Sequence, residues 1–206
     1  MHIRAPAIVC AVRPHAEHGA IARLLTPRDG LVAGYVRGGR SRRLRPVLLP
    51  GNIVEAEFRA RSEDQLAGLT VELTQSRGAL HTEPLAAAAI EWLAALTAAT
   101  LPEGHPYPRI HAALEGVLAA IEAAPSARRW VVGLVRYELL LLSELGFGGA
   151  DFGDVLRGGE APGWPAILAV LRDTGAHLAE HLFAGHRADV MAARGRLLDR
   201  LERAVA

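Results

Sequence analysis

The sequence has one cysteine, no lysine and few aromatic residues. The single cysteine, Cys10, excludes an internal disulfide framework and any zinc site built on several thiolates. A reducing, intracellular setting fits such a chain. All 23 basic residues are arginine, a bias to which we attach no functional meaning by itself. Aromatic residues make up 5% of the chain, so the sequence offers few rings for stacking against a ligand.

Long hydrophobic runs are also missing. The most apolar stretch, residues 130–147, is interrupted by Arg136, Glu138 and Glu144, and no basic segment followed by an apolar one opens the chain. The sequence therefore predicts a protein that is neither secreted nor membrane-spanning, with a cytoplasmic location. Its 206 residues, 50% of them hydrophobic, are enough for one or two domains with cores of their own.

The net charge of +1 hides an uneven distribution. Residues 1–80 contain 12 arginines and 7 acidic residues, whereas residues 81–206 contain 11 arginines and 15 acidic residues. A basic first part and a mildly acidic second part indicate a nucleic-acid-binding module joined to a part with another role.

Four arginines follow one another closely in residues 38–45, GGRSRRLR: Arg40, Arg42, Arg43 and Arg45. This segment contains two glycines and no carboxylate, so the charge has no partner within it. An anionic polymer is the natural external partner, and we interpret the segment as a phosphate-binding edge. The alternative is a solvated arginine loop without a ligand.

Short apolar and alternating runs predict five strands in the first 80 residues, at 7–13, 20–26, 31–37, 52–61 and 69–75. A short helical segment is expected after residue 46, between the third and fourth strands. This number and order favour a small Greek-key barrel of the oligonucleotide-binding (OB) type, which presents a strand face and loops to single strands.

Three further residues of these strands are candidates for DNA contact: Tyr35, Arg37 and Arg59. Alternation places Tyr35 and Arg37 on one face of the third strand, where they could stack on a base and bind its phosphate. A tyrosine in a strand belongs to the core more often, so the core is the first expectation. Arg59 lies on the water-facing side of the fourth strand, while Phe58 and the inward side of the fifth strand, with Leu73, face the core.

The pattern changes to helical spacing after residue 80. Helices are predicted at 83–100, 109–124, 127–145, 165–184 and 188–205, with Thr82 and Ser126 as candidate N-caps and a glycine-rich loop at 146–164. The sequence thus predicts an all-β domain, 1–80, followed by an all-α domain, 81–206. Arg136 lies in the most apolar helix and is expected to be buried. Its charge must then form an ion pair, extend to solvent or bind a ligand, and Glu138 and Glu144 are the candidate partners for an ion pair.

Two histidine pairs have the spacing of metal ligands. His15 and His18 lie in one turn, and His177, Glu180 and His181 spell H-x-x-E-H, a pattern of zinc hydrolases. Neither pair has an evident further ligand, so we expect polar surface, no metal and no cofactor. No combination of nucleophile and base and no glycine loop for phosphate stands out, so we expect no enzyme.

The quoted residues resemble those of a known family. The run GAIARLLTPRDGLVAGYVRGGRSRRLRPVLLPGNIVEAEF at 19–58 and the run VRYELLLLSELGFG at 135–148 resemble the RecO family of bacterial recombination mediators. The resemblance extends over nearly the whole length. Its most specific parts are the glycine-arginine loop and the apolar helix that ends at Leu145-Gly146-Phe147-Gly148.

The resemblance implies an OB barrel followed by a helical domain, acting without catalysis in the RecF recombination pathway. Such proteins bind single- and double-stranded DNA, anneal complementary strands, contact the acidic C-terminal tail of single-strand binding protein and, with RecR, help to load RecA. The same resemblance implies that Arg136 receives that tail, with Arg128 and Arg129 as weaker matches, and it implies a place in the cytoplasm at the nucleoid.

The chain departs from the family at one point. Many relatives carry a cysteine zinc finger after the segment corresponding to 145–152, which here is rich in glycine and free of cysteine. Zinc is accordingly not expected. The alternative to the mediator is a generic OB protein for single-stranded DNA or RNA, with a helical domain for dimerisation or partner binding and no affinity for the acidic tail.

Overall fold

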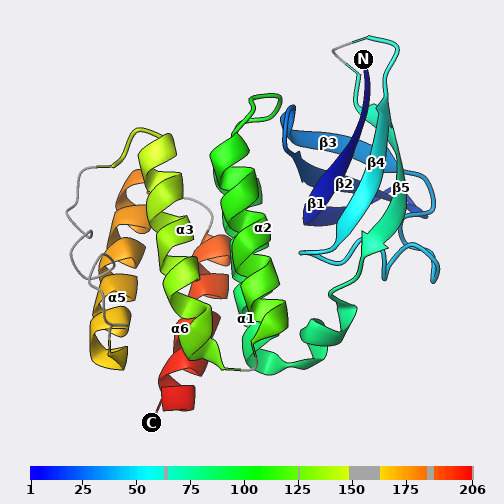
Figure 1. The fold of residues 1–206 in the computed structure, drawn as a ribbon. Coiled ribbons are helices and arrows are strands. Elements are labelled where there is room, and N and C mark those ends of the chain that lie inside the picture. Colours follow the sequence, from blue (N-terminus) through cyan, green and yellow to red (C-terminus); the bar gives the residue numbers. More distant parts are fainter. Residues whose placement is uncertain (63–64, 125, 149–162, 185–187, 206) are drawn as a thin grey trace. The chain divides into compact units, whose positions relative to one another are not determined.

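Five strands close into one barrel at the start of the chain (Figure 1). The computed structural model describes residues 1–62, 65–124, 126–148, 163–184 and 188–205. The strands are β1 (His2–His15), β2 (Gly19–Thr26), β3 (Gly30–Val36), β4 (Ile53–Arg59) and β5 (Ala67–Gln75). Their order around the barrel is β1-β2-β3-β5-β4, with β3 and β5 parallel and the other pairs antiparallel. The predicted OB-type barrel is confirmed.

Alternating residues of the strands fill the barrel, as period-two patterns require. In β4, Val54, Ala56 and Phe58 are fully buried, which confirms the prediction for this strand. In β5 the prediction is wrong at Leu73, which is 38% exposed. Leu73 lies opposite Val54 in the β4–β5 ladder, but β3 pairs with β5 only at Ala67 and Gly68. The far end of β5 therefore has a neighbour on one side only.

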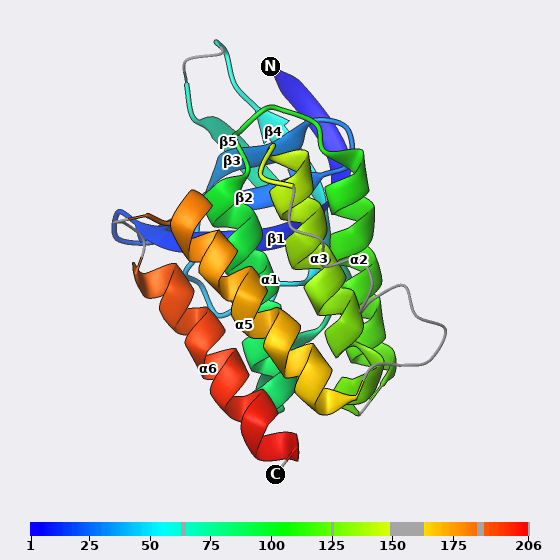
Figure 2. The ribbon, with the colours of Figure 1, turned by 90° about the vertical axis from the view of Figure 1, so that its left-hand side faces the viewer.

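The chain after the barrel is helical. It contains the 3₁₀ helices η1 (Gly78–Thr82) and η2 (Ala127–Arg129) and the α-helices α1 (Pro84–Thr100), α2 (Pro108–Ala123), α3 (Val131–Glu144), α5 (Trp164–His181) and α6 (Ala188–Val205). Figure 2 shows α5 and α6 running side by side. None of the helices in the described ranges is long and apolar enough to cross a bilayer. Most of the predicted loop at 146–164 lies outside the described residues.

Both predicted N-caps are wrong. The hydroxyl of Thr82 donates to the Ala79 carbonyl over 2.7 Å, so it serves the 3₁₀ turn before α1. Helix α1 instead begins with Pro84, whose missing N–H is one that the first turn leaves without an intrahelical partner. Ser126 precedes η2 and makes no capping hydrogen bond, and α3 begins four residues later than expected, at Val131.

The chain divides into two compact units, residues 1–112 and 113–206, and the division falls inside α2. In the first unit α1 packs against β1. The segment after α1 also joins the barrel, because the Gly104 N–H donates to the Leu31 carbonyl over 3.0 Å and Arg23 pairs with Glu103 at 3.0 Å. The compact unit therefore extends beyond the barrel, and a domain boundary at residue 80 stays a prediction.

In the second unit the buried charge on α3 is Glu138. Arg136 is exposed, so the expectation that it is buried is wrong. The two residues are two positions apart, which is about 200° around a helix, so one faces the bundle when the other faces solvent. The partner of Glu138 is Arg194 of α6, at 2.9 Å.

Candidate nucleic-acid interface

The arginine segment is held by two leucines that enter the barrel. Leu44 and Leu48 are 8% and 4% exposed and belong to the core of the barrel. Two helical turns place them, because the N–H of Arg45 donates to the Ser41 carbonyl and that of Leu48 to the Leu44 carbonyl, both over 3.0 Å. The helical turns thus begin at Ser41, five residues before the predicted position.

Four guanidinium groups lie on the outside of these turns. Arg40, Arg42, Arg43 and Arg45 are all exposed, as is Arg37 at the end of β3. Within the described residues, the side chains of Arg37, Arg42, Arg43 and Arg45 make no ion pair and no hydrogen bond. Opposite charge is therefore not supplied from within the barrel, which leaves these groups available for an external anion.

Both ends of the arginine segment are fixed. Arg40 donates through Nη1 to the Glu17 carbonyl over 2.9 Å and through its backbone N–H to the His18 carbonyl over 3.2 Å, so the segment is tied to the β1–β2 hairpin. At the other end, the buried Asn52 amide donates to the carbonyls of Pro46 and Val47 over 2.9 and 3.1 Å. The sequence analysis placed Asn52 at the start of the fourth strand and did not predict this role of its side chain.

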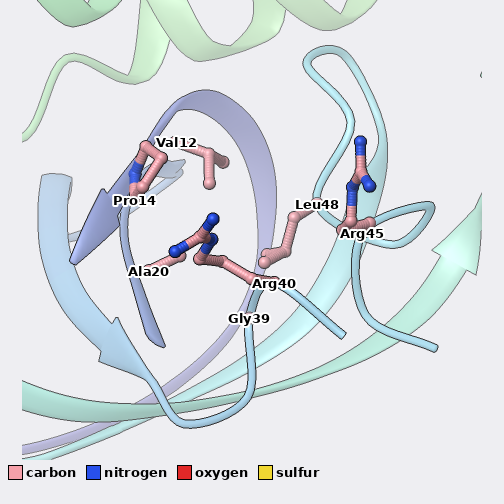
Figure 3. A pocket seen from close by; sticks show the side chains of 7 residues that line it. All are labelled: Val12, Pro14, Ala20, Gly39, Arg40, Arg45 and Leu48. Atoms are coloured by element: carbon pink, nitrogen blue, oxygen red, sulfur yellow. The ribbon is translucent and has the colours of Figure 1, made fainter. Parts of the chain in front are cut away.

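A cavity of about 410 Å³ lies between the arginine segment and the β1–β2 hairpin. We call it the loop cavity; it is lined by Val12, Pro14, Ala20, Gly39, Arg40, Arg45 and Leu48. Figure 3 shows the Arg40 side chain reaching towards Pro14 and Ala20, with Leu48 between Arg40 and Arg45. The cavity thus joins apolar walls to two guanidinium groups.

Tyr35 lies on the outer face of the barrel, and its expected place in the core is wrong. It is half-buried, because Val32 and Val36 are the residues of β3 that face the core. The ring lies over Gly19 of β2, where a Cβ atom would overlap it. The His15 ring meets it edge-on at a centroid distance of 5.9 Å. Gly19 therefore provides the flat surface on which the tyrosine rests.

The same outer face carries two residues that sequence reasoning did not select for DNA contact. Arg13 pairs with Ile21, and Ile21 pairs with Tyr35, so these three share a face. His15 pairs with Gly19 and joins them. Arg13 and His15 are exposed. Arg13 already lay in the predicted first strand, and extending that strand to residue 15 would have placed His15 on the same face.

Arg59 is separated from the other candidates. It ends β4, whereas the arginine segment precedes the first residue of β4, Ile53; six residues of strand span about 20 Å. Its Nη2 is 2.5 Å from the Glu57 carboxylate, which also contacts His2 at 2.9 Å. Hydrogen bonds from Arg59 and then His2 hold the pKa of Glu57 below its usual value. The charge of Arg59 is therefore partly offset locally.

The three arginines expected to bind the acidic tail are exposed in the second unit. Arg128 and Arg129 lie in η2, and Arg136 lies on α3. The guanidinium carbon of Arg128 is 5.9 Å from the centre of the Trp164 ring at the start of α5. Arg128 is thus placed beside an aromatic ring, at the distance of a cation–π contact.

The histidines of the H-x-x-E-H pattern form a ring cluster. The rings of His177 and His181 are 5.6 Å apart, and Phe147 stacks on His181 at 5.2 Å with an interplanar angle of 13°. In the ranges that the structure describes, no three histidine, cysteine or acidic side chains are grouped as metal ligands. His15 contacts Tyr35 instead of forming a site with His18.

The chain is an OB-barrel protein that carries an outward arginine segment on the barrel and a helical unit after it. Comparison with known families agrees with this class. Residues 1–77 match the family model for the N terminal part of recombination protein O, and residues 81–150 match that for its C terminal part. The chain belongs to the RecO family.

Individual relatives extend the similarity over the whole chain. DNA repair protein RecO of Rhodospirillum centenum is 37% identical in an alignment of 239 positions, which covers 96% of this chain and 94% of the relative. That of a Jannaschia species is 34% identical over 244 residues, covering 100% of this chain and 98% of the relative. That of Phenylobacterium zucineum is 41% identical over 149 residues, covering 72% and 60%.

Proposed function

We propose that this protein is a non-catalytic recombination mediator that binds single- and double-stranded DNA through the barrel and anneals complementary strands. The observation that carries the proposal is the arginine segment. Its guanidinium groups are exposed, those of Arg42, Arg43 and Arg45 are without partners in the described residues, and Leu44 and Leu48 hold the segment in the barrel. A fixed set of cations binds a polyanion without first breaking internal ion pairs.

Annealing needs no bond chemistry, but two polyanionic strands must be held close while their bases stay free to pair. Arginines that neutralise phosphates release counterions, which favours the complex and makes it sensitive to salt. Tyr35 and His15 add a small aromatic surface on the outer face of β1 to β3. With so few rings, stacking stays weak compared with charge, which suits a protein that must release bases.

We infer a second role for the helical unit, the capture of the acidic tail of single-strand binding protein. Arg136, Arg128 and Arg129 supply positive charge, and Trp164 beside Arg128 supplies an aromatic surface. The tail of single-strand binding protein is acidic and ends in an aromatic residue, so it can use both the positive charge of the arginines and the aromatic surface of Trp164. Together with RecR, the protein then promotes loading of RecA onto coated strands, in the cytoplasm and at the nucleoid.

The test is the annealing rate of two complementary oligonucleotides, each coated with single-strand binding protein, in the presence of a chelator. We expect this protein to accelerate annealing, because it both handles DNA and gains access through the coat. Arg136→Ala should lose the acceleration on coated strands and keep it on naked strands. Binding of naked strands without any acceleration of annealing would contradict the mediator and leave a generic OB protein.

A further inference from the structure

Beside the arginine segment, the loop cavity joins two kinds of lining. Val12, Pro14 and Ala20 from the β1–β2 hairpin and Leu48 from the barrel core provide apolar walls. Arg40 and Arg45 provide the charge (Figure 3). A nucleotide likewise has an apolar part, the faces of its base, and a charged part, its phosphate. The volume of about 410 Å³ lies within the range of small-ligand sites, about 300–1,000 Å³.

We propose that the loop cavity holds one unpaired base of a DNA single strand, with Arg40 and Arg45 on the adjoining phosphates. This inference rests on the proposed DNA binding and adds a site that distinguishes single strands from duplexes. Bases in a duplex are stacked and paired, so entry into a cavity would cost their pairing energy. A base in a single strand enters without that cost.

Contacts within the protein hold both walls of the cavity. Hydrogen bonds from Arg40 to the carbonyls of Glu17 and His18 hold one wall against the hairpin. Leu48, 4% exposed, holds the other wall in the barrel core. Arg40 keeps further N–H donors beyond the one used on Glu17, and Arg45 has no side-chain partner within the described residues. Little ordering is therefore needed when a nucleotide enters.

An acidic peptide with an aromatic end also combines negative charge with an apolar ring. The charges around the cavity favour the DNA strand over such a peptide. Arg42 and Arg43 lie between the two cavity arginines in the sequence, and Arg37 lies three residues before Arg40. A strand with a phosphate at every nucleotide can use this whole series of charges. A peptide that places one side chain in the cavity would leave most of them unused.

The test uses the unaltered protein and two single strands of equal length, one of thymidine nucleotides and one in which every base is replaced by an abasic tetrahydrofuran unit. Both strands carry the same phosphates. We expect the thymidine strand to bind roughly tenfold more tightly, which corresponds to about 1.4 kcal/mol. Equal affinities would overturn the cavity proposal while leaving phosphate binding intact.

Two variants separate the cavity from the Tyr35 surface. Val12→Met narrows the cavity without adding charge or a ring, so the affinity ratio of the two strands should fall towards one while duplex affinity is unchanged. Tyr35→Leu should keep most of the ratio. The reverse pattern, with the ratio lost in Tyr35→Leu and kept in Val12→Met, would assign base contact to the outer strand face instead.

Two further outcomes are informative. In the first, an acidic peptide with an aromatic end is added to the unaltered protein, and the ratio of the affinities for the thymidine and abasic strands falls to one. The occupant of the cavity would then be a peptide and not a base. Absence of binding to both strands and to duplex at low salt would overturn the proposed function as well. Circular dichroism and thermal unfolding of each variant establish that it is folded.

Discussion

Glu138 of α3 and Arg194 of α6 form a two-point ion pair inside the helical unit. Arg194 donates through Nε to Glu138 Oε1 over 3.0 Å and through Nη2 to Oε2 over 2.9 Å. The Glu138 side chain is fully buried and that of Arg194 is 4% exposed. Thr174 of α5 donates its hydroxyl to the same carboxylate over 2.7 Å. One carboxylate thus joins three helices of this unit, α3, α5 and α6.

We expect Glu138→Gln to destabilise the protein by about 3–5 kcal/mol, because the buried charge of Arg194 would lose the opposite charge of the Glu138 carboxylate. Urea unfolding followed by circular dichroism measures the effect. The matched control is Glu202→Gln, which removes the exposed pair between Arg172 and Glu202 at 2.7 Å. Exposed pairs contribute up to about 1 kcal/mol, so similar losses in both variants would contradict a special role for the buried pair.

The buried ion pair also shows what sequence patterns left out. Arg136 and Glu138 both interrupt one apolar helix, and the sequence alone does not say which of them faces the bundle. That choice depends on Arg194, a partner 56 residues later in the chain. Periodicity describes one element at a time, so it predicted the existence of α3 and misplaced its buried charge.

The barrel was more predictable than the site on its surface. Alternation in β4 and the apolar runs of the other strands were enough to predict five strands and their OB-type order. The arginine segment was visible as a charge cluster. The outer position of Tyr35 was not, because it depends on Gly19 in the neighbouring strand. The loop cavity could not be predicted either, since its walls come from three segments brought together by folding.

Gly19 is expected to be required by the Tyr35 ring. A Cβ at this position would overlap the ring, so Gly19→Ala must displace the tyrosine or the strand, at a cost of about 1–3 kcal/mol. The control is Gly68→Ala in β5, where the added Cβ would be 3.7 Å from the Arg59 carbonyl oxygen, an ordinary contact. Thermal unfolding compares the two. Combining Gly19→Ala with Tyr35→Leu should recover much of the loss, and failure to do so would assign the cost to the backbone.

Cys10 provides a pH-dependent test of the barrel. Burial raises the pKa of its thiol from 9.0 to about 12, with a smaller opposing effect of a hydrogen bond from the backbone of Leu25 to the sulfur. The unfolded chain loses this proton above about pH 9 and the folded chain does not, so deprotonation favours unfolding. Stability should be unaffected below pH 9 and fall by about 1.4 kcal/mol per pH unit between pH 9 and 12. Urea unfolding at several pH values measures the fall, which Cys10→Ala should reduce.

The same cysteine should be unreactive towards a thiol reagent at pH 8 until the barrel opens. It is 2% exposed and protonated at that pH, and thiolates are the reactive form. Because the chain has one cysteine, the colour released by a disulfide reagent reports this site alone. The reaction should follow the urea transition of the barrel. Rapid reaction in the absence of urea would contradict the packing around β1.

Replacing Arg40, Arg42, Arg43 and Arg45 by alanine should weaken DNA binding for all sequences alike, because phosphates carry no sequence information. For a single strand, each phosphate contact contributes about 0.7 to the slope of log affinity against log salt, so loss of four contacts should flatten the slope by about 3 units. Fluorescence anisotropy of a labelled oligonucleotide at several salt concentrations measures the slope.

The matched control for the arginine segment is Arg59→Ala, which removes one exposed arginine that already pairs with Glu57. If the arginine segment is the phosphate contact, this variant should change the slope by less than one unit. Arg59 and the four arginines of the segment lie at opposite ends of β4. A DNA strand bound along the arginine segment should therefore not contact Arg59. An unchanged slope in the fourfold variant, together with a flattened slope in Arg59→Ala, would move the DNA path to the opposite end of the barrel.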